Sequence, residues 1–194
     1  MKPWSGAGVH TQPVSVRRAR RMRRIAVIGP LGAGKSTLAV ELGRRLGLPV
    51  HHLDTLYWGE TWTPPSPAEW NALLDRLVAG DSWIIDGNFS STLPQRLDAA
   101  DTVVYLDASP LLSTMRATKR RLLHNWRPAP GVAGGSRPMF DRQIFRWIWA
   151  FPRESRTQLL EQLAAPPLVG KAVILRSRRD VRHFLATVAA DSVR

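Results

Sequence analysis

The segment spanning residues 29–37 constrains the fold of this chain more than any other stretch. It matches the pattern G-x-x-x-x-G-K-[ST] of a phosphate-binding loop. An apolar run over residues 25–28 precedes it, and leucines at 38, 42 and 46 follow at helical spacing. The sequence therefore predicts a strand, a glycine-rich loop and a helix in succession. We expect this loop to bind a nucleotide through the residues Gly29, Pro30, Leu31, Gly32, Ala33, Gly34, Lys35, Ser36 and Thr37.

Each residue type in the loop has a defined part in holding phosphate. The glycines allow a tight turn that aims successive backbone N–H groups at an anion. The helix that follows adds its unpaired N–H groups and the positive end of its dipole. Lys35 is expected to reach the β- and γ-phosphates, and the Ser36 hydroxyl is expected to bind Mg²⁺. ATP and Mg²⁺ are therefore the expected ligands.

The composition is consistent with one cytoplasmic domain that handles phosphate. The 194 residues include no cysteine, which excludes a disulfide framework and a thiolate metal site. An apolar share of 44% suffices for a core, and no apolar run approaches the roughly 20 residues of a membrane span. The net charge of +13 has two explanations, which are affinity for nucleic acid and arginines gathered around a polyanion such as ATP.

The charge pattern divides the chain into a basic extension over residues 1–22 and a folded domain over residues 23–190. The first 21 residues contain four clustered arginines, no acid and no apolar periodicity, so we expect them to be disordered. One hypothesis is that translation starts at Met22. The alternative is a basic arm that binds nucleic acid or a membrane surface. The intact mass of the native protein distinguishes the two.

Strand and helix patterns alternate through the folded domain. This alternation predicts an α/β fold, with a parallel sheet that is covered by helices on both faces. Right-handed crossovers then bring the loops after the strands to one edge of the sheet, where ligands bind. The expected strands span residues 24–28, 49–53, 82–86, 102–106 and 172–175, and the expected helical segments span residues 35–46, 67–79, 92–98, 110–124, 141–164 and 178–189.

Charged side chains follow most of the expected strands. Asp86 follows an apolar strand, and we assign it to Mg²⁺, held through water. Asp54 follows the second strand and is the candidate substrate contact, with helix capping as the alternative. Asp107 precedes a helix-start signal and is interpreted as structural. The adjacent histidines at 51 and 52 alternate faces, so at most one faces the site. Arg176 ends the fifth strand and is a candidate nucleotide contact.

The region of about residues 55–80 is the expected acceptor-binding lobe. Tyr57, Trp58, Trp62 and Trp70 surround a proline-rich stretch there. These rings would either stack on a ring of the acceptor or pack the lobe's own core. We expect packing for Trp70.

A loop rich in proline and glycine over residues 126–139 is flanked by arginines on the helices before and after it. We expect a lid over about residues 124–141 that closes on the transferring phosphoryl group. Arg142, Arg146 and Arg153 share one helix face, and Arg156 lies on the same helix. We assign Arg142 and Arg146 to substrate binding.

Taken together, these motifs resemble adenylate-kinase-like P-loop proteins, and more narrowly the DNA topology modulation proteins of the FlaR type. The resemblance covers about residues 23–189 and includes the phosphate loop, residues 52–54, residues 83–88 and residues 173–177. It implies a three-layer P-loop NTPase fold, with a five-stranded parallel sheet in the order 2-3-1-4-5, and an ATP-dependent phosphotransferase site. It also implies that Arg116 binds the nucleotide and that Arg120 and Arg121, with Lys35 and Asp86, are catalytic.

The chain departs from the adenylate kinase pattern where the acceptor phosphate is bound. Asp86 and Gly87 match, but Ser90 stands where that pattern has an arginine. Arg96 is a candidate replacement that no motif supports. The Thr-Gly-Asp pattern typical of AMP recognition is also missing after the second strand. The acceptor therefore stays open between a nucleotide and a small molecule with a hydroxyl group.

Three functions fit the sequence. The leading one is a kinase that transfers the γ-phosphoryl group of ATP to a nucleotide or a small-molecule acceptor. The second is a nucleic-acid-binding regulator in which the nucleotide site is a switch, and it depends on the net charge and the basic extension. The third is an ATPase without an acceptor. Phosphotransfer assays and DNA binding at physiological salt distinguish them.

Overall fold

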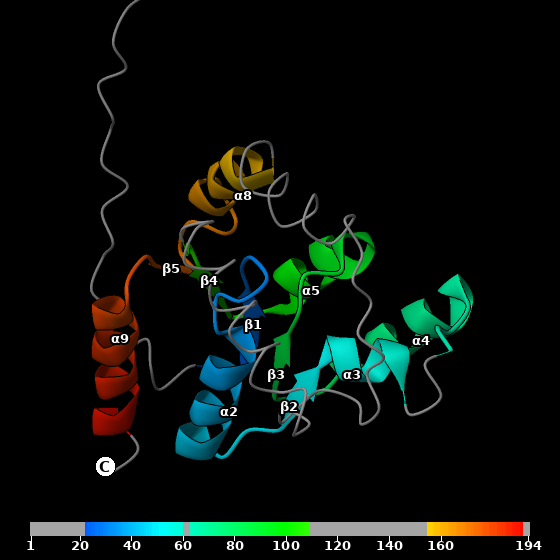
Figure 1. Cartoon of the computed structure of the whole chain (residues 1–194), viewed down its shortest axis with the longest axis horizontal. Helices are drawn as coiled ribbons and strands as arrows, with labels where there is room; N and C mark the ends of the chain where they lie inside the picture. The colour runs from blue at the N-terminus through cyan, green and yellow to red at the C-terminus, as the bar shows by residue number, and fades with distance from the viewer. Residues whose placement is uncertain (1–21, 60–62, 109–154, 192–194) are drawn as a thin grey trace, which may run out of the picture.

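Five parallel strands form one sheet at the centre of the protein (Figure 1). The computed structural model describes residues 22–59, 63–108 and 155–191. Along the sheet the strands run in the order β2-β3-β1-β4-β5, which confirms the expected three-layer P-loop fold and its strand order. Their bounds are β1 Arg24–Ile28, β2 Val50–His52, β3 Trp83–Asp86, β4 Thr102–Leu106 and β5 Ala172–Leu175.

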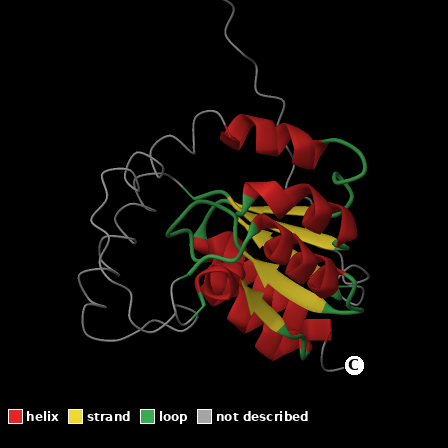
Figure 2. Ribbon diagram, turned by 90° about the vertical axis from the view of Figure 1, so that its right-hand side faces the viewer, coloured by secondary structure: helices red, strands yellow, loops and turns green. Residues whose placement is uncertain are grey.

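Helices cover both faces of the sheet (Figure 2). Helices α2 (Lys35–Leu46) and α9 (Arg178–Asp191) pack on one face. The other face carries α3 (Leu53–Trp58), α4 (Pro67–Val78), α5 (Leu93–Ala99) and α8 (Ser155–Ala164). A short 3₁₀ turn, η1 (Ser90–Thr92), leads into α5. No helix among the described residues is long and apolar enough to cross a bilayer.

The two cores follow from the alternation of side chains along β1. Ile25 and Val27 point to the α2 and α9 side, while Ala26 and Ile28 point to the opposite side. All four are essentially inaccessible to solvent. This segment is a continuous apolar run because the strand is buried on both faces, as expected for the central strand of a parallel sheet. Met22, just before β1, is also buried in the α2 and α9 core.

The expected elements agree with the described ones to within a few residues, with one omission. Leu53 was expected to end the second strand, but it is the first residue of helix α3, which the sequence analysis missed. A helix of six residues is too short to show a helical period, and it has no side-chain cap to mark its start. The expected helix 110–124 and loop 126–139 lie outside the described residues, as does most of the expected helix 141–164 before α8.

An aromatic cluster fills the lobe between β2 and β3. The ring of Trp70 is only 4% exposed and lies 5.0 Å from the ring of Tyr57 and 4.9 Å from that of Phe89, between centroids. This confirms the expected packing role of Trp70. Trp58 contacts Tyr57 edge-on and is 38% exposed, while Trp62 lies outside the described residues.

Two glycines allow the strand ends to approach their neighbours closely. Gly29 has φ of 147°, and a Cβ atom there would lie 2.6 Å from the backbone oxygen of Leu106 on β4. Gly87 has φ of 136°, and a Cβ atom there would lie 2.8 Å from Cβ of Leu53. Both positions combine an unfavourable backbone for other residues with a steric clash. They keep the loops after β1 and β3 tight against the sheet.

We predict that Gly87→Ala lowers the free energy of unfolding by about 2–4 kcal/mol, because the methyl group combines backbone strain with overpacking. Denaturant unfolding measures this. Gly170→Ala is the matched control, because a Cβ atom there meets nothing within 4 Å, and we expect a change within about 0.5 kcal/mol. Equal stability of the two variants would contradict this account of the Gly87 turn.

Candidate active site

The carboxyl ends of the strands bring the phosphate loop and several charged side chains to one edge of the sheet. The register pairs Val27 of β1 with Asp86 of β3, and His52 of β2 with the same aspartate. On the other side of β1, Asp107 follows β4 and Arg176 follows β5. This is the edge at which open α/β sheets bind their ligands.

The phosphate loop is folded as a cradle that ends at the start of α2. Gly34 caps the helix in a left-handed conformation with φ of 99°, and no side chain caps this end. The first N–H groups of α2 are therefore directed towards the loop, with the positive end of the helix dipole. Nζ of Lys35 donates hydrogen bonds to the carbonyl oxygens of Gly29 at 2.9 Å and Pro30 at 3.1 Å. Ser36 follows in the first turn of the helix.

The side chain of Asn88 holds the first peptide of this loop. Its Oδ1 accepts from the Gly29 N–H at 3.2 Å, and its Nδ2 donates to the Gly29 carbonyl at 2.7 Å. The two bonds close a ring, so the backbone N–H and carbonyl of Gly29 together fix the position and the orientation of the Asn88 side-chain amide. Asn88 therefore ties the loop after β3 to the loop after β1.

Arg96 fixes the backbone on both sides of Asn88. Its guanidinium donates to the carbonyls of Gly87 at 2.8 Å and Phe89 at 3.0 Å, the residues on either side of Asn88. Its Nε donates to the carbonyl of Thr92 at 3.3 Å. Arg96 is fully buried, and burial lowers its pKa to about 10, against the opposing effect of Asp86. The suggestion that Arg96 binds an acceptor phosphate is therefore wrong, because its donors are directed at backbone carbonyls inside the fold.

Asp86 lies at the end of β3 with 3% exposure. Its Oδ2 lies 3.1 Å from Nδ1 of His52, although the geometry of this ion pair falls short of a hydrogen bond, and Oδ2 accepts none from the described residues. At 3.1 Å the carboxylate still favours the protonated imidazole, because opposite charges attract strongly over so short a distance. This short contact with the Asp86 carboxylate raises the pKa of His52, while burial opposes the rise. His51 is half-buried, and burial lowers its pKa.

A second ion-pair cluster lies beside the phosphate loop. Arg156 at the start of α8 makes a two-pronged contact with Asp107, with Nε and Nη2 both 2.8 Å from carboxylate oxygens. Nε of Arg176 is 3.7 Å from the same carboxylate. Asp107 is buried, while both arginine side chains are 44% exposed. The position of Asp107 before a helix-start signal predicts a structural role, and it gives no sign of the pairing with these arginines.

The other expected site residues are placed as follows. Asp54 is the second residue of α3, exposed and next to His52, whose pKa it also raises. The remaining members, Arg116, Arg120, Arg121, Arg142 and Arg146, lie outside the described residues, as do the lid and residues 1–21. Sequence reasoning missed the role of Asn88, although its place two residues after the strand-end aspartate was a usable signal.

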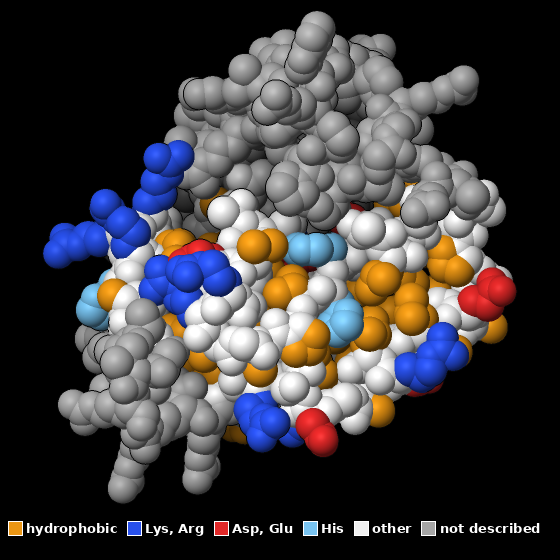
Figure 3. Space-filling view, turned by 90° about the horizontal axis from the view of Figure 1, so that it is seen from below, with side chains coloured by type: hydrophobic (Ala, Val, Ile, Leu, Met, Phe, Trp, Pro, Cys, Tyr) orange, Lys and Arg blue, Asp and Glu red, His pale blue; other side chains and the backbone are white. Residues whose placement is uncertain are grey.

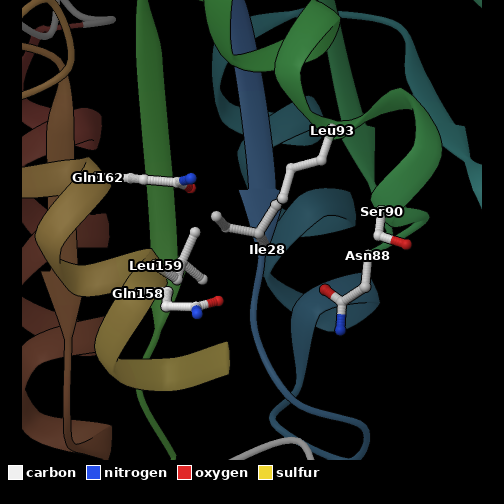
Figure 4. Close-up of a pocket in the computed structure, with 7 residues that line it drawn as sticks. All are labelled: Ile28, Asn88, Ser90, Leu93, Gln158, Leu159 and Gln162. Carbon is white, nitrogen blue, oxygen red and sulfur yellow. The ribbon is translucent and has the colours of Figure 1, made fainter. Parts of the chain in front are cut away.

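A pocket of about 170 Å³ opens beside the first peptide of the phosphate loop (Figure 4). It lies between the end of β1, the loop that leads to α5, and α8. A larger hollow of about 470 Å³ lies at the start of β1, beside Arg23, Arg24, Asp81 and Asp101. There Asp101 accepts from the backbone N–H groups of Arg23 and Arg24. That hollow is at the end of the sheet away from the phosphate loop, so we assign no chemistry to it.

The basic side chains on the face shown in Figure 3 lie in separate groups, with uncharged surface between them. A groove that tracks a nucleic acid backbone requires a continuous basic stripe. The described residues on this face do not form one.

We predict that the pKa of His52 lies above its ordinary value of 6.5 and falls in Asp86→Asn, because the amide cannot stabilise the imidazolium. By linkage, the pair stabilises the fold fully below about pH 6.5, and that contribution is lost as the pH rises through the folded-state pKa. NMR titration of the imidazole protons measures the pKa of His52 in the parent protein and in Asp86→Asn. His51 is the internal control and should titrate below 6.5 in both proteins. An unchanged His52 pKa in Asp86→Asn would contradict the pairing.

We predict that Arg96→Met lowers the free energy of unfolding by about 2–4 kcal/mol, since it leaves buried carbonyl groups unpaired. It should also weaken ATP binding, because Asn88 loses its support. Denaturant unfolding and calorimetry measure the two effects. The control is Arg182→Met on the exposed side of α9, for which we expect a change within about 0.5 kcal/mol. Unaltered stability of Arg96→Met would show that these carbonyls find other partners.

Comparison with known proteins supports the fold. No protein-family model matches the chain, and no curated protein does. Among solved structures, the chain is similar to shikimate kinase from Acinetobacter baumannii in complex with shikimate, with 17% identity, a TM-score of 0.53, and 90% of this chain and 94% of that chain covered. It is also similar to shikimate kinase from Bacteroides thetaiotaomicron, with 20% identity, a TM-score of 0.50, and 87% and 97% covered. At these identities the likeness establishes a P-loop kinase-like fold.

Proposed function

We propose that this protein is an ATP-dependent phosphotransferase that moves the γ-phosphoryl group of ATP to a small-molecule acceptor. The observation that carries the proposal is a complete phosphate loop at the carboxyl edge of the sheet, with Asp86 on the neighbouring strand. The P-loop kinase-like fold supports it. The sequence resemblance to adenylate-kinase-like proteins, including the topology modulation type, is part of the same proposal.

The residues at this edge suit Mg²⁺ that arrives with the nucleotide. Oδ2 of Asp86 is buried, lies 3.1 Å from Nδ1 of His52 and accepts no hydrogen bond from the described residues, and this carboxylate could accept one from metal-bound water. The Ser36 hydroxyl would bind the ion directly, as in other phosphate loops. Among the described residues, no group of three or more His, Cys, Asp or Glu side chains is placed to hold a metal ion by itself, which suits an ion held largely by phosphate oxygens. When bound, Mg²⁺ neutralises charge on the β- and γ-phosphates.

The chain's own residues supply positioning and positive charge. Lys35 lies over the loop carbonyls and would turn its ammonium group to the β- and γ-phosphates when the nucleotide enters. Arg156 and Arg176 both contact Asp107 beside the loop, and their side chains are partly exposed. They are candidates for contact with the nucleotide phosphates. Arg116, Arg120 and Arg121 remain proposed as further cationic contacts, and Arg142 and Arg146 remain proposed for the substrate.

The proposed reaction is an in-line transfer in a loose transition state. A bond forms between an acceptor oxygen and the γ-phosphorus, and the bond from that phosphorus to the β,γ-bridging oxygen breaks, which releases ADP. A hydroxyl acceptor also loses its proton. Asp54, exposed at the start of α3, is the candidate base for that proton.

We predict that Lys35→Ala lowers kcat/KM for phosphotransfer by at least about 100-fold, because a charge aimed at the transition state is lost. A screen with ATP and Mg²⁺ against uncharged and anionic acceptors, followed by detection of ADP and phosphorylated product, measures this. Lys171→Ala is the control. Lys171 lies just before β5, at the opposite end of that strand from Arg176, and its Nζ donates a hydrogen bond to the carbonyl of Asp98. Its kcat/KM should stay within about twofold.

The outcomes of this screen distinguish the alternatives. Phosphate release without any phosphorylated product would indicate an ATPase. Absence of Lys35-dependent ATP chemistry, together with sequence-selective DNA binding at physiological salt, would favour the nucleic-acid-binding regulator. Either result would overturn the proposed kinase activity.

A further inference from the structure

The pocket beside the phosphate loop is built from three parts of the chain. Ile28 ends β1, immediately before Gly29. Asn88, Ser90 and Leu93 come from the segment that joins β3 to α5, and α8 supplies the opposite wall (Figure 4). A molecule in this pocket would therefore lie against the same strand end that begins the phosphate loop.

The described lining of the pocket is uncharged and combines polar with aliphatic side chains. It consists of three carboxamides, one hydroxyl group and three aliphatic side chains. Carboxamides both donate and accept hydrogen bonds, as hydroxyl groups do, so the two kinds of group pair in either direction. The aliphatic side chains suit the C–H faces of a small molecule. These residues are Asn88, Gln158, Gln162, Ser90, Ile28, Leu93 and Leu159.

Asn88 belongs to the pocket and to the phosphate loop at once. Its amide uses one N–H group and one oxygen lone pair in the two hydrogen bonds with Gly29. A carboxamide has two N–H groups and two lone pairs, so one of each is left for a ligand. A hydroxyl group bound there would lie next to the loop that holds the donor phosphates. The pocket is thus placed to present an acceptor oxygen.

Among the described residues, the cations around the pocket are already paired or assigned to the donor. Nζ of Lys35 bonds the same Gly29 carbonyl as Asn88 and is proposed to turn to the donor phosphates. Arg96, the guanidinium nearest to Asn88 in sequence, is fully buried and donates to the carbonyls of Gly87, Phe89 and Thr92. Arg156 is on the same helix as the two glutamines but is paired with Asp107. An acceptor phosphate or carboxylate generally requires an unoccupied cation or several aimed N–H groups.

We infer that this pocket binds the phosphoryl acceptor and that the acceptor is an uncharged polyhydroxy compound, such as a simple sugar or polyol. The inference rests on the proposed function. The volume of about 170 Å³ is several times the roughly 30 Å³ that one water molecule occupies in the liquid, which leaves room for a pentose, a hexose or a cyclitol. The transferred phosphoryl group would bond to one of its hydroxyl oxygens, and the proton of that hydroxyl group would be released to solvent.

The test uses pairs of compounds that differ in charge. Glucose is compared with gluconate, and ribose with ribose 5-phosphate, with glycerol, myo-inositol and AMP as further acceptors. The full chain is assayed with ATP and Mg²⁺, and kcat and KM are measured for each compound. In parallel, NMR follows the side-chain amide signals of Asn88, Gln158 and Gln162 while each compound is added with a non-hydrolysable ATP analogue.

Three variants connect the result to the pocket. Gln158→Leu and Gln162→Leu remove amides and should each raise the KM of the preferred acceptor about tenfold, with kcat and the KM for ATP little changed. Gln162→Lys adds a cation and should shift the preference between glucose and gluconate at least about tenfold towards gluconate. Thr157→Val, exposed on α8 and outside the pocket, is the control and should change nothing.

The expected result is phosphorylation of at least one uncharged compound about 100-fold more efficiently than its charged partner, together with shifts of the pocket amide signals. Preference for gluconate, ribose 5-phosphate or AMP would overturn the inference while leaving the kinase proposal intact. Transfer that the glutamine variants do not affect would also overturn it, as would amide signals that no uncharged compound moves. Loss of all Lys35-dependent transfer and ATP binding would instead overturn the proposed function itself.

Discussion

The pairing of the Asn88 side chain with both backbone groups of Gly29 is the contact on which the geometry of the site depends. It joins two loops that lie 59 residues apart in sequence. The parallel register of β1 and β3 brings them together, since Val27 lies beside Asp86. The carbonyl oxygen of Gly29 in turn accepts a hydrogen bond from the ammonium group of Lys35. A shift of Asn88 would therefore move the start of the phosphate loop and its lysine together.

Support for this contact comes from deeper in the fold. Arg96 binds the carbonyls on both sides of Asn88, and Gly87 allows the turn to press against Leu53. A buried guanidinium is costly unless its donors are satisfied. Here the donors of Arg96 bond three backbone carbonyls, so the buried guanidinium fixes the conformation of the loop after β3. On the neighbouring strands, the buried Asp86 forms an ion pair with the partly buried His52.

The charges at this edge are arranged unevenly, which separates the two substrates that we propose. Cationic groups gather around the phosphate loop, where Lys35, Arg156 and Arg176 lie close to the carboxyl ends of β1, β4 and β5. The pocket between α5 and α8 is lined by amides and aliphatic groups. A polyanionic donor and an uncharged acceptor match this division. Asn88 is common to both regions, so the acceptor hydroxyl and the donor phosphates are expected to meet there.

The sequence was sufficient for the framework of the fold and for the phosphate loop. A strand that is buried on both faces is an apolar run, and the glycine spacing after β1 has few other uses. Helix α4 could also be placed, because Ser66, Pro67 and Glu69 form a capping box with proline in the first turn. The contacts of Asn88 and Arg96 could not be predicted, because they join side chains to backbone carbonyls and N–H groups that only the sheet register brings close. Helix α3 was missed because six residues carry no period.

The central claim is that the γ-phosphoryl group goes to a hydroxyl group of an acceptor and not to water. The reaction can be run in water labelled with heavy oxygen, with ATP, Mg²⁺ and the uncharged sugars and polyols, and the products examined by mass spectrometry. Transfer to a hydroxyl group predicts a phosphate ester without solvent oxygen, because the ester oxygen comes from the acceptor. Inorganic phosphate that carries one solvent oxygen, with no phosphate ester, would contradict the account.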